Sequence, residues 1–275
     1  MNTRANSPNP GRNRASIGVG LNLSYRVFYV WKRNLVAYKR FIIPTLLVSL
    51  GEPFFYLVAM GLGLGAYMGM FNGGSYIQFL APGLLIASCM LTASFECLYD
   101  SFVRMIHEKI YSSLIVTPIS AEDVVAGDIA WGTFRGVISG SLMFLIAVLL
   151  GALPLSPGVI IGFFALMVVT GFLFGSLAMI VTSYAPNFDF FNYYTQLLIS
   201  PMFFFSGVFF PLEKFPAWVQ QLSLFLPLTH AVKLARAIVA GRFEWPLAFN
   251  LAVLLVLGIV AFYLAVKSMK RRLIK

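Results

Sequence analysis

The chain has 275 residues, of which 59% are hydrophobic and only 11% are charged, and its formal net charge is +10. Soluble domains carry charge on about a quarter of their residues, and disordered chains are poor in hydrophobic residues, so both classes are excluded. The apolar runs are about 20 residues or longer, which is the length of a spanning helix rather than of a barrel strand. We therefore predict an all-α integral membrane protein built as a six-transmembrane-helix bundle.

The N-terminal 40 residues contain two predicted elements. Residues 1–16 are polar, rich in Pro, Asn and Arg, and lack the apolar middle of a signal peptide, so we expect residues 1–23 to form a disordered cytoplasmic tail. Residues 24–40 (SYRVFYVWKRNLVAYKR) are amphipathic and predict a helix in the cytoplasmic headgroup plane. Two interpretations of this helix stay open: a lipid anchor, or an anchor whose basic face also docks a cytoplasmic partner. Its apolar arc consists of Phe28, Trp31, Leu35 and Tyr38.

Residues 41–275 form the predicted permease domain. Its six apolar segments are residues 42–64, 76–99, 129–150, 159–183, 194–210 and 247–266. Fifteen of the twenty Lys and Arg residues lie before the first segment, after the second or after the last. Because positive charge concentrates on the cytoplasmic side of membrane proteins, both termini are predicted to be cytoplasmic. Anionic lipid headgroups are then the expected partners of these charges, and no nucleic-acid partner is expected.

Ionisable side chains inside the spans are costly, so each is a candidate for a partnered or functional role. Glu52 lies near the midplane of the first span, where it could be protonated, line a polar pathway or accept a proton. Acidic and basic residues recur every four positions toward the end of the second span: Glu96, Asp100, Arg104 and Glu108. We expect Asp100 to pair with Arg104, and Glu96 or Asp100 to meet Arg135 of the third span. Such a pair either holds two helices together or opens as a gate.

The connection between the second and third spans is longer than a tight turn. Its sequence, RMIHEKIYSSLIVTPIS (residues 104–120), predicts a short helix around residues 108–115 that lies across the membrane surface and ends before Thr117-Pro118. Because two spans flank this helix, a push on it would move both of them.

The third span is predicted to begin well outside the membrane. Ser120 and Asp123 form a capping-box-like pattern at its start. A helix over residues 121–150 would be ~45 Å long, which exceeds the ~30 Å hydrocarbon core. We therefore expect this helix to project into the cytoplasm and to hold Glu122, Asp123 and Asp128 in water.

The outer connection between the fifth and sixth spans, residues 211–246, is rich in Pro and aromatic residues. Residues 215–225 and 228–240 read as two short apolar helices that are too short to span and too apolar for water, which predicts a re-entrant hairpin in the outer leaflet. Phenylalanines crowd the preceding end of the fifth span, either facing lipid and core or forming an aromatic collar around a pathway. They are Phe203, Phe204, Phe205, Phe209 and Phe210.

Glycines recur at four-residue spacing, which allows close helix packing within the bundle or at a dimer seam. They are Gly61/Gly65, Gly132/Gly136/Gly140 and Gly171/Gly175. Cys89 and Cys97 are read as buried hydrophobic residues. There is no phosphate-binding GxxxxGK[ST] loop, HExxH or GxSxG motif, so no catalytic, metal or cofactor site is expected in this chain.

Five segments carry a family resemblance: EPFFYLVAMGLGLG (52–65), FLAPGLLIAS (79–88), FVRMIHEKIYSSLIVTPISAEDVVAGDIAWG (102–132), FFFSGVFFPLEKFPAW (203–218) and LPLTHAVKLARAIVAG (226–241). From residue 24 onward the chain resembles the type-2 ABC exporter permeases, specifically the nodulation protein J family and its O-antigen and polysaccharide exporter relatives.

The resemblance implies the permease of an exporter in the bacterial cytoplasmic membrane. Two copies would pair and bind two copies of a separate ABC ATPase subunit, which would hold ATP and magnesium. The cargo would be an amphipathic glycan, glycolipid, lipo-oligosaccharide or drug-like molecule. Residues 106–117 or so would form the coupling helix seated on the ATPase. The coupling residues implied are His107, Glu108, Lys109, Ile110, Tyr111, Leu114, Thr117 and Pro118.

Two other classes of function stay open from the sequence. A secondary transporter or channel driven by an ion gradient would show inverted repeats, broken midplane helices and several intramembrane acids, whereas Glu52 stands alone. A membrane-embedded transferase would require clustered His, Asp, Glu or basic residues at one membrane face.

Overall fold

A computed structural model describes residues 23–40, 42–68, 70–71, 74–241 and 245–273. Apart from Leu23, the predicted tail of residues 1–23 lies outside them. The elements in the first half are α1 (Val27–Tyr38), α2 (Ile42–Val58), the wide π-type turns η1 (Ala59–Leu64), α3 (Gly65–Met68), the hairpin strands β1 (Met70–Phe71) and β2 (Gly74–Ser75), α4 (Tyr76–Phe95), the π-type turns η2 (Glu96–Asp100) and η3 (Val103–His107), and α5 (Ile110–Ile115).

The second half is also helical. Its elements are α6 (Ala121–Leu149), α7 (Pro157–Tyr184), the short turn η4 (Phe188–Phe190), α8 (Phe191–Tyr194), the π-type η5 (Thr195–Ile199), α9 (Ser200–Phe205), the turn η6 (Leu212–Lys214), α10 (Ala217–Ser223), α11 (Pro227–Ala240) and α12 (Trp245–Leu273). Within the described residues the fold is therefore all-α apart from one two-stranded hairpin.

Among the described residues, four helical segments are long and apolar enough to cross a bilayer: Tyr76–His107, Ala121–Leu149, Pro157–Tyr184 and Leu247–Leu273. They differ in how much of each is buried by the rest of the protein. In the most apolar window of Tyr76–His107, 83% is buried, whereas in that of Leu247–Leu273 only 33% is buried. The α4 segment is thus the axis of the bundle and α12 lies at its periphery. The described residues are therefore consistent with an all-α membrane protein.

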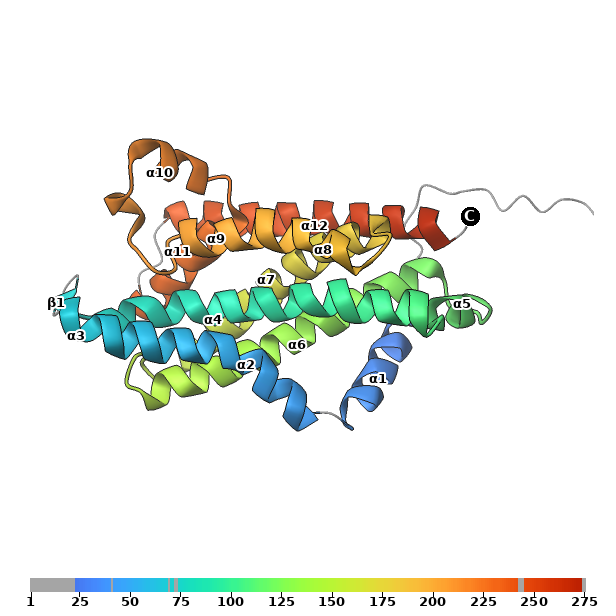
Figure 1. The fold of residues 1–275 in the computed structure, drawn as a ribbon, viewed down its shortest axis with the longest axis horizontal. Coiled ribbons are helices and arrows are strands. Elements are labelled where there is room, and N and C mark those ends of the chain that lie inside the picture. Colours follow the sequence, from blue (N-terminus) through green and yellow to red (C-terminus); the bar gives the residue numbers. More distant parts are fainter. Residues whose placement is uncertain (1–22, 41, 69, 72–73, 242–244, 274–275) are drawn as a thin grey trace, which may run out of the picture.

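The remaining predicted spans are shorter or broken. The first corresponds to α2, η1 and α3 in sequence, and the fifth to α8, η5 and α9. Both run lengthwise beside the long helices (Figure 1). In the outer connection, α10 and α11 meet at 89°, as a broken span or a re-entrant loop would. The count of six crossings and the re-entrant hairpin stay predictions.

Glycines bring the long helices into close contact. A Cβ atom on Gly136 of α6 would lie 2.8 Å from the backbone oxygen of Cys89, and one on Gly132 would lie 2.6 Å from Cys97 Sγ. On α7, a Cβ on Gly171 would lie 3.2 Å from the Cα of Thr133. These glycines therefore pack within one copy of the chain, and both cysteines are buried free thiols, as predicted.

Helix α1 lies against the first half of α6 rather than standing apart from the bundle. Its buried residues are Val30, Asn34 and Tyr38, whereas Phe28 is exposed. Gly127 of α6 makes room for this helix, because a Cβ there would lie 2.6 Å from the side chain of Val30. The helix thus forms where the amphipathic pattern predicted it, but its protein-facing side is centred on Val30 and Asn34.

Candidate functional site

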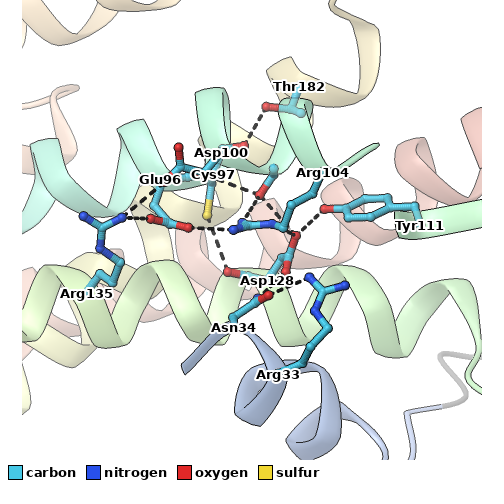
Figure 2. A network of polar contacts seen from close by, with 11 residues as sticks. Arg33, Asn34, Glu96, Cys97, Asp100, Arg104, Tyr111, Asp128, Arg135 and Thr182 are labelled. Carbon is cyan, nitrogen blue, oxygen red and sulfur yellow. Dashed lines mark hydrogen bonds and ion pairs between the residues drawn. The ribbon is translucent and has the colours of Figure 1, made fainter. Parts of the chain in front are cut away.

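A buried carboxylate, Asp128 of α6, is the centre of the polar network in Figure 2. Its side chain is fully buried. Oδ1 accepts a hydrogen bond from Asn34 Nδ2 at 2.6 Å. Oδ2 accepts hydrogen bonds from Arg104 Nε at 3.2 Å, Tyr111 OH at 2.5 Å and Ser101 Oγ at 3.3 Å. A buried charge is tolerated only when it is paired and hydrogen-bonded, and this one is satisfied by donors from three separate segments.

The expectation that the start of α6 holds its acids in water is wrong. Glu122, Asp123 and Asp128 are all buried. Glu122 pairs with Lys270 of α12 at 2.5 Å, and Asp123 accepts the backbone N–H of Ser24 at 2.8 Å. The helix does extend to Ala121 as predicted, but α1, α5 and the end of α12 pack around it and take the place of water.

The Ser120–Asp123 capping box is confirmed. Ser120 Oγ accepts the N–H of Asp123 at 3.0 Å, and Asp123 Oδ2 accepts the N–H of Ser120 at 3.3 Å. The same Asp123 carboxylate therefore caps α6 with one oxygen and holds the residue at the start of α1 with the other.

Glu96 links two guanidinium groups from different helices. Its Oε1 pairs with Arg104 Nη1 at 3.0 Å, and its Oε2 pairs with Arg135 Nη1. Arg135 also pairs with Asp100 Oδ2 at 3.2 Å and lies 4.9 Å from the ring centroid of Tyr38. The prediction that Glu96 or Asp100 meets Arg135 is confirmed for both acids.

The expected pair between Asp100 and Arg104 is wrong, because Arg104 pairs with Glu96 and Asp128 instead. Burial gives the reason: the side chain of Asp100 is 52% exposed, whereas those of Glu96 and Asp128 are 1% and 0% exposed. Water can solvate Asp100, so the nearest guanidinium stabilises the two carboxylates that water cannot reach.

A third guanidinium approaches the network through an amide. Arg33 Nη2 donates to Asn34 Oδ1 at 2.6 Å, while the Nδ2 of the same amide donates to Asp128. Three carboxylates, Glu96, Asp100 and Asp128, are thereby set against three guanidiniums. On α5, burial and the adjacent Asp128 carboxylate raise the pKa of Tyr111 well above its usual range, so its hydroxyl stays protonated and donates.

A cavity of about 780 Å³ adjoins this network. It is lined by residues of α1, α2, the α4 segment and α6, together with Ile110 at the start of α5. Its lining combines the charged residues above with aromatic rings, the mixture of polar and apolar groups that ligand sites use. The residues lining it include Arg33, Tyr38, Pro53, Phe95, Glu96, Tyr99, Asp100, Arg104, Trp131 and Arg135.

The residues expected to couple to an ATPase divide into an exposed group on either side of α5 and a buried or partly buried group within it. Tyr111 is fully buried and Ile110 and Leu114 are partly buried, so the expectation that Tyr111 lies on the surface is wrong. Lys109, with φ of 52°, turns the chain sharply between η3 and α5. The exposed members are His107, Glu108, Lys109, Thr117 and Pro118, to which the structure adds the 89% exposed Val116.

The predicted aromatic cluster separates into two groups. Phe203, Phe204 and Phe209 contact one another, and Tyr56 of α2 joins them with its ring centroid 5.6 Å from those of Phe203 and Phe209. Phe205 and Phe210 instead contact Phe215. The side chain of Glu52 lies outside the described part of the structure, so its role stays a prediction.

Sequence reasoning missed Asn34, Ser101 and the burial of Asp128. One signal was present: Asp128 precedes Arg135 by seven residues, which is two helical turns, so both lie on one face of α6. Asn34 gave no such signal, because a single amide on an amphipathic helix reads as part of its polar side. Among the described residues, no group of three or more His, Cys, Asp and Glu could hold a metal ion.

Comparison with known proteins identifies relatives over nearly the whole chain. A family model described as ABC-2 type transporter matches residues 25–240. The chain is 38% identical to nodulation protein J of Sinorhizobium fredii (strain NBRC 101917 / NGR234), in a match that covers 89% of this chain and 93% of that protein. It is 33% identical to nodulation protein J of Rhizobium leguminosarum bv. viciae, with 90% and 94% covered. It is 26% identical to the inner membrane transport permease YadH of Escherichia coli (strain K12), with 88% and 93% covered.

Proposed function

The chain belongs to the ABC-2 type transporter family, and on this premise we propose that it is the transmembrane subunit of an ATP-driven exporter for an amphipathic glycan, glycolipid, lipo-oligosaccharide or drug-like molecule. It is a permease in a bacterial membrane and belongs to a non-catalytic membrane family. The energy source would therefore be a separate ABC ATPase. Two copies of it would bind two copies of this chain on the cytoplasmic side. ATP and magnesium would be held by that partner.

The observation that carries the proposal is the geometry of α5. This short helix connects the end of the α4 segment to the start of α6, two of the helices long enough to span a membrane. The three residues that follow it, Val116, Thr117 and Pro118, are exposed, and we call them the coupling tip. Within α5, Tyr111 is hydrogen-bonded to the buried Asp128 of α6. A displacement applied to the tip is therefore transmitted to both spanning helices.

The ion-pair network admits a static or a moving role. Glu96, Asp100, Arg104 and Arg135 are close enough to neutralise one another and hold α4 against α6. Because Glu96 divides its two oxygens between two guanidiniums, a shift of α6 along α4 could also exchange partners, as a gate would. The six crossings, the cytoplasmic termini, the interface position of α1 and the re-entrant α10–α11 pair complete the proposed topology.

The direct test is export in proteoliposomes that contain this chain and its ABC ATPase. With a fluorescently labelled lipo-oligosaccharide as the probe, we expect transport with ATP and none when the catalytic glutamate of the ATPase is replaced by Gln. Unchanged flux with the inactive ATPase, or flux driven by this chain alone under an ion gradient, would replace the proposal with a secondary transporter or channel.

A further inference from the structure

Helices α1 and α5 meet at one residue although about 80 positions separate them in the chain. Asp128 uses each of its carboxylate oxygens for a different partner helix (Figure 2). Oδ1 accepts from Asn34 of α1, and Oδ2 accepts from Tyr111 of α5 and from Arg104. A carboxylate that bridges two elements in this way fixes the distance between them as well as the position of each.

A second set of contacts ties the beginning of α1 to the chain that follows α5. The Arg26 guanidinium donates to the carbonyl oxygen of Pro118, and the Ser24 N–H donates to Asp123. Contacts near both ends of α1 therefore connect it to α5 and to the first turns of α6. The connected segments are residues 24–38, 110–115 and 121–131. We call these three segments the α1–α5 platform.

Helix α2 lies outside this platform. The 780 Å³ cavity separates the two, with Arg33, Ala37 and Tyr38 of α1 on one side and Thr45 and Pro53 of α2 on the other. Helices α1 and α2 also diverge from each other in Figure 1. Any movement of the platform relative to α2 therefore changes the width of the cavity.

We propose that Asp128 is a positioning residue that joins α1 to α5, so that a displacement of the coupling tip moves α1 and opens or narrows the cavity against α2. This inference rests on the proposed function, because it takes the displacement from a partner ATPase. It assigns α1 a part in energy coupling, beyond that of a lipid anchor. Asp128 acts here through Tyr111 and Asn34 and is not assigned any contact with cargo.

The test measures distances between spin labels in the complete permease–ATPase complex. Cysteines are introduced at Val36 of α1, Val116 at the coupling tip and Phe55 of α2, whose side chains are 59%, 89% and 67% exposed. The native cysteines are buried and remain unlabelled. In the wild type we expect the Val36–Val116 distance to be equal without nucleotide and with ATP and vanadate, and the Val36–Phe55 distance to change.

Three variants then separate the bridge from general stability. Tyr111→Phe removes the donor from α5, and Asn34→Leu removes the donor from α1. The control is Ser101→Ala, which removes a donor to the same carboxylate but leaves both bridging bonds. Because both bonds meet at Asp128, either bridging variant should reduce the nucleotide-dependent Val36–Phe55 change, and the double variant should reduce it little further. The contacts of Arg26 and Ser24 at the other end of α1 account for the change that remains. Residues that contribute only local stability would give additive losses.

The outcomes distinguish this inference from the proposed function. Two results would overturn the connection of α1 to α5 through Asp128 and leave the proposed exporter function unaffected. One is a Val36–Val116 distance that changes with nucleotide in the wild type, and the other is an undiminished Val36–Phe55 response in both bridging variants. Loss of the response in Ser101→Ala to the same degree would also count against it. A wild-type Val36–Phe55 distance that does not respond to nucleotide would also overturn this inference, whereas only the loss of ATP-dependent export in proteoliposomes would remove the proposed function itself.

Discussion

At the residue scale, the carboxylate of Glu96 is the point at which α4 and α6 depend on each other. Its two oxygens pair with Arg104 from its own segment and with Arg135 from α6. Two long side chains thus compensate one charge that is almost completely buried. A double variant in which Glu96 and Arg135 are exchanged would not reproduce these ion pairs, because the new arginine at position 96 would lie next to Arg104.

The coupling between these residues can be measured by removing charges instead of exchanging them. Arg135→Met should destabilise the protein by about 3–5 kcal/mol, because it leaves Glu96 and Asp100 short of one cation. In the double variant with Glu96→Gln, the loss should be smaller than the sum of the single losses, since no unpaired carboxylate remains at position 96. Unfolding of the detergent-purified chain provides the free energies, and strictly additive losses would show that the two side chains do not interact.

The capping box at the start of α6 is a second residue-scale feature. Ser120→Ala removes the acceptor for the N–H of Asp123 and should cost about 1 kcal/mol. Asn in place of Ser should retain most of the stability, because it is a good capping residue. Hydrogen exchange at the first turn of α6 measures the effect locally. Ser113→Ala, at an exposed position of α5, is the matched control, and equal protection in the Ser120→Ala variant and the wild type would contradict the role of the cap.

At the element scale, the distance between α4 and α6 is set by glycine. Gly136→Ala would bring a Cβ within 2.8 Å of the Cys89 carbonyl oxygen, which belongs to the backbone and cannot rotate away. We expect a loss of about 1–3 kcal/mol from forced separation of the helices. Gly158→Ala, near the start of α7, meets nothing within 4 Å and should be neutral or slightly stabilising. Thermal unfolding of the two variants compares them directly, and similar midpoints would contradict the packing argument.

Helix positions could be predicted from the sequence where one local pattern decides them. Length and hydropathy placed α4, α6, α7 and α12, and the Ser120–Asp123 pattern located the start of α6. The rotation of α1 could not be predicted in the same way. It depends on the notch at Gly127 and on the hydrogen bond between Asn34 and Asp128, which join positions about 95 residues apart.

The charged site was predictable only in part for a similar reason. An arginine inside a span needs an acidic partner, so the contact of Arg135 with Glu96 and Asp100 followed from the cost of burying charge. The two partners of Arg104, Glu96 and Asp128, are the most deeply buried carboxylates of the network, and residue spacing along a helix does not reveal burial. The length of α6 predicts that its first turns project beyond the bilayer. It does not predict that α1, α5 and the end of α12 cover those turns and bury Asp128.

At the scale of the whole molecule, polar and apolar features follow the long axis of the bundle. The coupling tip and the basic end of α12 lie at one end, and α10 and the small hairpin lie at the other (Figure 1). The helix surfaces between the ends are rich in exposed apolar side chains, especially on α12. Such a surface would be an aggregation risk in water and fits a lipid environment.

This arrangement predicts which side of the membrane each end faces. Val116→Cys at the coupling tip should react with a membrane-impermeant maleimide only in inside-out vesicles, and Lys214→Cys beside α10 only in intact spheroplasts. The wild-type chain is a suitable background because its two cysteines are fully buried. Trp218→Cys tests whether the α10–α11 pair is re-entrant. If α10 enters the outer leaflet, the cysteine at position 218 should react with a membrane-permeant maleimide and not with the impermeant one. Labelling of Val116→Cys and Lys214→Cys from the same side would refute the six-span topology, because an odd number of crossings must separate them.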